Sequence, residues 1–346
     1  MNSTPQAVEL ELQISVGKPV ILAAPQLPDM NAALGWLAEH RQALRGILLR
    51  YGHLLVRGLP IDSAQDFAAV RDGFFEQRAQ YKEKATPRRS FGNDIYSSTE
   101  IQSMHTIRMH NENSYTLDFP GKLAFCCIEA PNSGGATTVV DVRKVLAAVP
   151  AELAARFRKL GWLLARHFHG GAISLPWAVS FGTDDRDQVR AYCEQNMVTA
   201  SWRPDEVLTT RQHRPAVIAH PVTEEEVWFN HVAFWSSHSL DEEMREVLEA
   251  NYGADALPFE TYLGDGSALT AEEVGALNRA YDLHTCRESW RKGDVMFVDN
   301  ILCAHGRESF EGGRRVLVAM GEPISLADCP HTPAPRVVEA TAALAD

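Results

Sequence analysis

The sequence predicts a mostly β protein with flanking helices, folded as a double-sheet jelly roll, also called a double-stranded β-helix. Short apolar runs separated by turn residues recur beyond residue 100, a pattern typical of antiparallel sandwiches and barrels. Segments with helical periodicity lie before and between these runs. The chain contains neither GxGxxG nor GxxxxGK[ST], so the usual signals of a doubly wound nucleotide-binding sheet are missing.

The N-terminal part is predicted to alternate helices with a strand. Asn31 to Arg50 carries leucine and isoleucine side chains at nearly helical spacing. His53 to Arg57 has the apolar run of a buried strand, which a glycine and a proline end. Asp62 and Ser63 are candidate caps of a second helix, which we expect to reach about Lys84.

The strands of the jelly roll are predicted from apolar runs between turn signals. In chain order these runs are Thr106 to Glu112, Leu123 to Ile128, Thr137 to Asp141, Trp162 to His169, Val217 to His220, Val227 to Asn230, Val295 to Val298, Ile301 to Ala304 and Val316 to Met320. Two helical insertions are expected around Asp184 to Met197 and Thr270 to Arg291.

The composition is that of a soluble globular protein, with 346 residues of which 45% are hydrophobic and 23% charged. We expect one domain over residues 1–346, with the jelly-roll core at about 50–322 and a tail at 332–346. The net charge of −12, without a basic stripe, argues against nucleic acid as a partner. No apolar run approaches ~18 residues, which argues against a membrane span. Six cysteines without a CxxC pair, and no visible secretory signal, favour buried thiols in a reducing cytoplasm.

Two distant segments carry residues that suit a metal. On one strand, His110 and Glu112 would point to the same face, with Cα atoms about 6.6 Å apart. An HxE triplet alone is weak evidence, because it occurs by chance in many chains. His305 ends a second apolar strand, and the next predicted strand opens with Arg314 and Arg315. Two histidines and one carboxylate form the facial triad of non-haem Fe(II) sites, and an arginine fork suits a carboxylate ligand.

Together these segments resemble the TauD/TfdA family of Fe(II)/2-oxoglutarate-dependent dioxygenases. Within it, the chain is similar to the clavaminate synthase-like and SyrP-like branch, which uses HxE where other branches use HxD. The resemblance runs from about His53 to Glu322. It rests on five ordered motifs: G-H-L-L-V-R-G-L, H-N-E-N-S-Y, G-G-A-T-T-V-V-D, W-F-N and D-N-x-x-x-A-H-G-R followed by R-R.

The resemblance implies the ligands of the iron and of the co-substrate. His110, Glu112 and His305 would bind Fe(II), leaving positions for 2-oxoglutarate and O2. Arg315 would hold the distal carboxylate of 2-oxoglutarate, with Arg314 as the alternative. Thr137 would donate its hydroxyl to the same carboxylate, and its neighbour Thr138 is the alternative there. A carboxylate ligand also favours hydroxylation over halogenation, since related halogenases lack it.

The resemblance further implies a small substrate, an amino acid or an amino-acid-derived group, free or tethered to a carrier protein. Asn230, Arg307 and Tyr115 are candidate substrate-binding residues, although a purely structural role for Asn230 stays open. Hydroxylation of an unactivated C–H bond is the expected reaction, with desaturation, cyclisation or epoxidation as alternatives on the same iron centre. A zinc hydrolase and a non-catalytic binding protein on this fold are the remaining alternatives.

Two loop-like segments are candidate lids over such a site. One is 170–185, where Trp177 and Phe181 would shield the reacting centre. The other is 88–99, immediately before the metal-binding strand.

Overall fold

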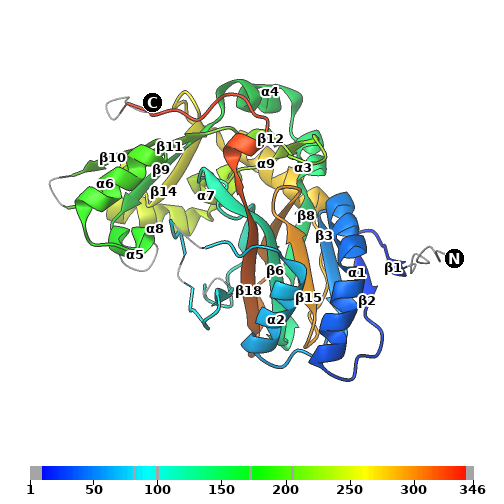
Figure 1. Ribbon diagram of the computed structural model, residues 1–346. Helices are drawn as coiled ribbons and strands as arrows, with labels where there is room; N and C mark the ends of the chain where they lie inside the picture. Colours follow the sequence, from blue (N-terminus) through cyan, green and yellow to red (C-terminus); the bar gives the residue numbers. More distant parts are fainter. Residues whose placement is uncertain are drawn as a thin grey trace.

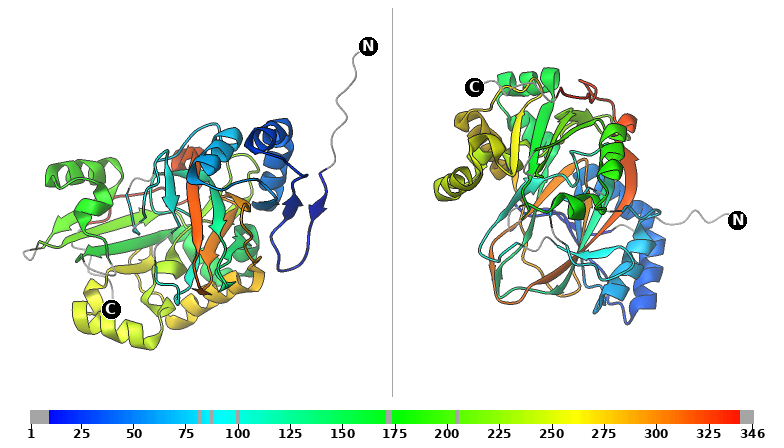
Figure 2. Two further views of the ribbon diagram at one scale, coloured as in Figure 1. Left: turned by 90° about the horizontal axis from the view of Figure 1, so that it is seen from below. Right: turned by 90° about the vertical axis from the view of Figure 1, so that its left-hand side faces the viewer.

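The fold was analysed in a computed structural model, which describes residues 10–80, 83–86, 88–98, 101–170, 174–203 and 206–339. Two facing β-sheets occupy the right-hand part of Figure 1, and helices cover their outer side. A separate four-stranded sheet with its own helices extends to the left (Figures 1 and 2). The predicted class, mostly β with flanking helices in a jelly roll, is confirmed.

The N-terminal segment supplies three strands of the large sheet and two helices that pack against its outer face. It consists of β1 (Leu12–Gln13), β2 (Ile21–Ala23), α1 (Met30–Tyr51), β3 (His53–Arg57) and α2 (Ala64–Phe74). Asp29 begins α1 by accepting a hydrogen bond from the Ala32 amide, and Ser63 and Asp66 form a capping box at α2. The helix predicted to reach Lys84 therefore ends ten residues earlier, at Phe74. Beyond it the chain leaves the helical layer and crosses toward the other end of the molecule.

The large sheet has seven strands in the order β1-β2-β3-β15-β6-β18-β4, antiparallel except for the pair β2 and β3. Its remaining members are β4 (Ile95–Ser97), β6 (Asp118–Glu129), β15 (Val295–Asp299) and β18 (Arg315–Ser325). A three-stranded sheet faces it, in the order β5-β16-β8, made of β5 (Ile107–His110), β16 (Cys303–Arg307) and β8 (Thr137–Asp141). Phe125 and Val318 of the first sheet pack with Val139 and Cys303 of the second in one buried cluster. This shared core is what a double-sheet jelly roll requires.

The second sheet system lies in the insertions between β8 and β15. Its four strands run in the order β10-β11-β9-β14, and further elements surround them. In chain order the insertions contain α3 (Val142–Ala148), α4 (Ala151–Leu160), β9 (Trp162–Phe168), α5 (Trp177–Phe181), α6 (Arg186–Gln195), β10 (Val198–Trp202), β11 (Leu208–Arg214), β12 (Val217–Ala219), β13 (Glu226–Trp228), α7 (Val232–Trp235), α8 (Glu242–Tyr252), β14 (Phe259–Leu263) and α9 (Ala271–His284). Outside the insertions, the short strands β7 (Ser133–Gly134) and β17 (Phe310–Glu311) pair with each other. Several were not predicted, β11 because its buried run LTTRQHR is almost wholly polar.

The C-terminal segment crosses the second sheet system. From 329 to 339 it contains no helix or strand, and the Arg336 guanidinium donates to the Gly264 carbonyl at 2.6 Å. Among the described residues, no helix has both the length and the apolar character that a membrane crossing needs. All six cysteines lie in described segments and are free thiols.

Candidate active site

The pairing of two short strands brings the candidate metal ligands together. β5 and β16 are antiparallel neighbours, and His110 lies directly opposite His305 in their register. The two imidazole centroids are 4.3 Å apart. Glu112 follows two residues after the end of β5, so it stands in a turn and not on the strand as predicted. One strand pair and one turn therefore deliver three ligands from two distant parts of the chain.

Asn300, in the turn between β15 and β16, fixes the backbone of Glu112 on both sides. Its Oδ1 accepts from the Glu112 amide at 2.7 Å, and its Nδ2 donates to the Glu112 carbonyl at 2.9 Å. The same Nδ2 also donates to the Pro120 carbonyl at 2.8 Å. Asn300 is fully buried, so these bonds are shielded from water. The D-N motif of the sequence thus positions the carboxylate ligand.

The three side chains can hold one metal ion. One ligand atom from each of His110, Glu112 and His305 lies within 4.8 Å of the others, and all three residues are buried. Nδ1 of His110 donates to the Arg108 carbonyl at 3.0 Å, which leaves Nε2 for a metal. Nε2 of His305 lies 3.5 Å from Oε2 of Glu112. Two imidazoles and one carboxylate are the donor set that suits non-haem Fe(II), so the residues fit that ion.

Burial and neighbouring charges keep His110 and Glu112 in the protonation states that metal binding needs. Burial, and then the proximity of His305, lower the pKa of His110 to about 3, so its ring is neutral at pH 7. Burial alone would raise the pKa of Glu112, but Arg88 and the two histidines hold it well below its usual range. Neutral imidazoles and an ionised carboxylate bind a divalent metal without first losing protons.

An arginine cavity of about 340 Å³ lies on one side of the triad, lined by Thr137, Ser98, Phe125, His305 and Arg314 among others. Nε of Arg314 donates to the Gly135 carbonyl at 2.8 Å, and Nη1 donates to Oγ of Ser98 at 3.0 Å. No carboxylate pairs with Arg314 within the described parts of the chain. Burial, and then Arg307, lower the pKa of its guanidinium to about 10. A buried cation without an anion fits the distal carboxylate of 2-oxoglutarate.

The structure contradicts the expectation that Arg315 holds this carboxylate, because the side chain that lines the cavity belongs to Arg314. Arg315 is exposed, and the register of β18 is irregular between Arg315 and Val316. Arg314, the alternative, is the arginine that faces the cavity. Thr137 lies there as predicted, with Oγ1 3.4 Å from Nη2 of Arg314. Oγ1 of Thr138 instead points to Sδ of Met109 at 3.6 Å.

All three predicted substrate contacts have structural partners, and the Tyr115 hydroxyl donates to the Glu83 carbonyl at 2.9 Å. Nδ2 of Asn230 donates to the Ala216 carbonyl at 3.0 Å, and its Oδ1 accepts from the Val232 amide at 3.1 Å. Both ends of that amide therefore fix the start of α7. The Arg307 guanidinium donates to three backbone carbonyls of the loop 101–105, at 2.8 to 3.0 Å. Arg307 lines the arginine cavity, but its donors hold this loop in place.

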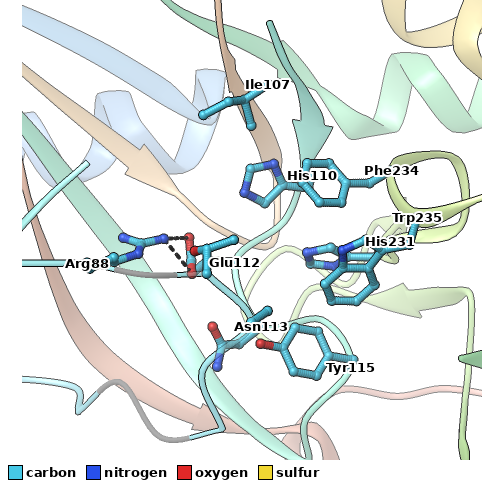
Figure 3. A pocket seen from close by; sticks show the side chains of 11 residues that line it. Arg88, Ile107, His110, Glu112, Asn113, Tyr115, His231, Phe234 and Trp235 are labelled. Atoms are coloured by element: carbon cyan, nitrogen blue, oxygen red, sulfur yellow. Dashed lines mark hydrogen bonds and ion pairs between the residues drawn. The ribbon is translucent and has the colours of Figure 1, made fainter. Parts of the chain in front are cut away.

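Tyr115, the third, lines an aromatic cavity of about 330 Å³ on the other side of the triad. Three further rings line it, from His231, Phe234 and Trp235, and Figure 3 shows them gathered beside His110. His231 stacks on Trp235 with centroids 4.2 Å apart, and burial holds its pKa well below the usual range. Sequence reasoning missed these three residues, although His231 directly follows the W-F-N motif.

Arg88 is a further residue that sequence reasoning did not single out. Its Nη2 donates to both carboxylate oxygens of Glu112, each at 2.9 Å (Figure 3). It lines both cavities. The second candidate lid, 88–99, therefore does touch the site as far as it is described, whereas 99 lies outside the described residues. In the other candidate lid, 170–185, residues 171–173 lie outside the described residues. Trp177 and Phe181 of this segment pack against the apolar cluster around Phe168.

Comparison with known proteins gives consistent results over nearly the whole chain. Residues 24–320 match the family model described as taurine catabolism dioxygenase TauD, TfdA family. The dapdiamide synthesis protein DdaC of Enterobacter agglomerans is 34% identical over 322 residues, which cover 91% of this chain and 97% of that protein. A clavaminate synthase-like protein of Arabidopsis thaliana is 27% identical over 293 residues, covering 82% of this chain and 86% of its own.

Solved structures share the fold. PvcB, an Fe, alpha-ketoglutarate dependent oxygenase from an isonitrile synthetic pathway, superposes with a TM-score of 0.54 at 16% identity, covering 97% of this chain and 99% of its own. AAD-2, solved in complex with Mn(II) and N-oxalylglycine, gives a TM-score of 0.51 at 13% identity, over 91% and 97% of the two chains.

Proposed function

The chain belongs to the TauD/TfdA family and is a non-haem Fe(II)/2-oxoglutarate-dependent dioxygenase, and on that premise we propose that it oxidises a small amino-acid-derived substrate. The expected reaction is hydroxylation of an unactivated C–H bond. The observation that carries the proposal is the buried triad of His110, Glu112 and His305, flanked by the buried cation of Arg314. A zinc hydrolase has no use for that arginine.

We assign His110, Glu112 and His305 as the iron ligands. The ferrous ion and 2-oxoglutarate, when bound, supply the oxidising chemistry, and 2-oxoglutarate leaves as succinate and CO2. Arg314 orients the co-substrate by holding its distal carboxylate, and Thr137 donates to the same group. The neutral ring of His110 contributes no charge that would repel the metal.

The aromatic cavity is the proposed substrate site. Tyr115, Phe234 and Trp235 provide flat apolar walls beside His110, which exclude water and orient a small molecule. The relative DdaC is named for the synthesis of dapdiamide, which supports an amino-acid-derived substrate here. Whether the substrate is free or attached to a carrier protein is decided by the experiment below.

We also propose a reducing location such as the cytoplasm. This is supported by the six free thiols, of which five are buried. Burial raises the pKa of Cys127 and of Cys193 to about 12, so these thiols are poor nucleophiles at neutral pH.

Anaerobic loading with Fe(II) and 2-oxoglutarate, followed by oxygen and a panel of amino acids, tests the function. The panel should include free amino acids, their amides and aminoacyl groups on a carrier protein. We expect one class to increase succinate release and to gain one oxygen atom by mass spectrometry. Loss of two hydrogens instead would identify desaturation or ring closure, and a product from an olefin would identify epoxidation. Substrate conversion without Fe(II) or oxygen would contradict the proposal.

A further inference from the structure

Arg88 places its guanidinium on the carboxylate of a metal ligand. Nη2 is equidistant from Oε1 and Oε2 of Glu112, at 2.9 Å from each. Both side chains are buried, with 4% and 5% of their surface exposed. A donor at equal distance from both oxygens lies in the plane that bisects the carboxylate. A metal that bound both oxygens equally would lie in the same plane.

The loop that carries Arg88 is fixed on both sides of it. On one side the Glu83 carboxylate is buried and accepts from Arg166 at 3.0 Å, from Gln212 at 3.0 and 3.1 Å and from the Tyr192 hydroxyl at 3.0 Å. On the other side the Arg89 amide donates to Oγ of Ser97 at 2.8 Å. These bonds tie the loop to the second sheet system and to β4. Arg88 is therefore held over the triad by contacts outside the triad.

The binding mode of Glu112 determines how many positions a metal keeps open. A carboxylate binds a metal through one oxygen or through both. In an octahedral site, two histidines and a one-oxygen carboxylate leave three positions, which 2-oxoglutarate and O2 together require. A two-oxygen carboxylate leaves only two. Glutamate has one more rotatable bond than aspartate, so the HxE variant has more freedom to take the second mode.

We propose that Arg88 is a positioning residue that restricts Glu112 to one-oxygen coordination and thereby keeps three positions free at the iron. Oε2 is the oxygen on the histidine side, 3.5 Å from Nε2 of His305, and is the atom left to the metal. Arg88 retains Oε1 and lies in the bisecting plane. The proposal depends on the ligand assignment made above but not on the identity of the substrate.

The test measures metal and co-substrate binding separately, without turnover. Full-length wild type, Arg88→Gln, Arg88→Lys and Arg89→Gln are titrated anaerobically with Co(II), followed by visible absorbance, and then with 2-oxoglutarate. Arg89 is the matched control, because it is the exposed neighbour on the same loop. In Arg88→Gln we expect Co(II) affinity to be unchanged or higher, since a second oxygen is released and a positive charge is removed. We expect 2-oxoglutarate affinity to fall on the order of tenfold or more.

The variants separate positioning from a general structural role. Arg88→Lys retains a cationic donor and should recover most of the 2-oxoglutarate affinity, while Arg89→Gln should match wild type. Unchanged 2-oxoglutarate affinity in Arg88→Gln would overturn the proposal. So would a parallel loss of Co(II) and 2-oxoglutarate binding in both Arg88 variants, which would show that Arg88 only supports the fold. If wild type itself bound no Co(II), the ligand assignment would fail, and this proposal with it.

Discussion

The arginine cavity and the aromatic cavity share Arg88, Ile107 and His110, yet they are built in different ways. The arginine cavity takes its polar groups from the jelly roll itself, with Thr137 on β8 and Arg314 immediately before β18. The aromatic cavity takes its rings from the turn after β5 and from α7, which belongs to the insertions. The arginine cavity adds the cation of Arg314, whereas the aromatic cavity adds the rings of Tyr115, His231, Phe234 and Trp235, and burial holds the pKa of His231 well below its usual range.

This difference indicates a division of labour across the metal. In the proposed function, the jelly roll would supply a fixed anion site for the co-substrate, and the insertions would supply a surface whose shape selects the substrate. Variants on the two sides should therefore fail in different ways. Loss of a metal ligand should disable both cavities, whereas a change in the aromatic cavity alone should have the smallest effect.

His110→Ala removes a ligand shared by both cavities and should have the largest effect. We expect turnover to fall by on the order of a thousandfold or more, because neither side functions without the metal. Removal of iron with a chelator should give the same loss, and Fe(II) should restore wild type only. Steady-state succinate release measures both. His105→Ala is the matched control, since His105 is exposed in the same segment, and equal losses in the two variants would contradict the ligand assignment.

Arg314→Gln should disable the arginine cavity alone. It removes the cation that faces the co-substrate, and we expect the 2-oxoglutarate requirement to rise about a hundredfold. The substrate requirement should change by less than about threefold, because the aromatic cavity does not contain this residue. Apparent KM values for both compounds measure the split. Arg315→Gln is the adjacent exposed control, and a larger effect there would reinstate Arg315 as the carboxylate ligand.

Asn300→Ala should weaken both sides to a similar extent, because it frees the backbone of Glu112. Loss of its bonds leaves buried backbone groups unpaired, at a cost of about 1 to 3 kcal/mol in the free energy of unfolding. We expect metal affinity to fall about ten- to a hundredfold. Urea unfolding of the metal-free protein and a Co(II) titration measure the two quantities. A stable variant with full metal affinity would show that the β15–β16 turn does not position Glu112.

The two cavities also differ in how far the sequence predicts them. Motif order and the family resemblance singled out His110, Glu112, His305 and Thr137, and the structure brings the first three together and places Thr137 beside Arg314. Strand periodicity and antiparallel pairing determine which residues of the jelly roll meet. The choice between Arg314 and Arg315 failed by one position. The register irregularity at the start of β18 decides that choice, and a one-residue shift reverses the face to which a side chain points.

Strand periodicity and pairing could not predict which loop residues reach the site. Arg88 reaches Glu112 only because Glu83 is anchored to the second sheet system, whose polar strand β11 has no apolar alternation to reveal it. Asn230 and Arg307 carry side chains suited to substrates, but both are used by backbone partners that only the tertiary structure supplies. The sequence therefore predicted the fold and three side chains that can hold a metal, but of the rings that line the aromatic cavity it singled out only Tyr115.

Phe234→Ala should change the aromatic cavity alone, with the smallest effect of the four. Its ring lies against His110 with centroids 4.6 Å apart and is only partly buried, so the fold should tolerate its removal. We expect the substrate requirement to rise about tenfold, from the loss of one apolar contact surface. The 2-oxoglutarate requirement should stay at its wild-type value. More succinate should form per product molecule, because a poorly held substrate is oxidised less often in each cycle. Comparing succinate with product measures this ratio, and an equal rise in both requirements would show that the two cavities act as one.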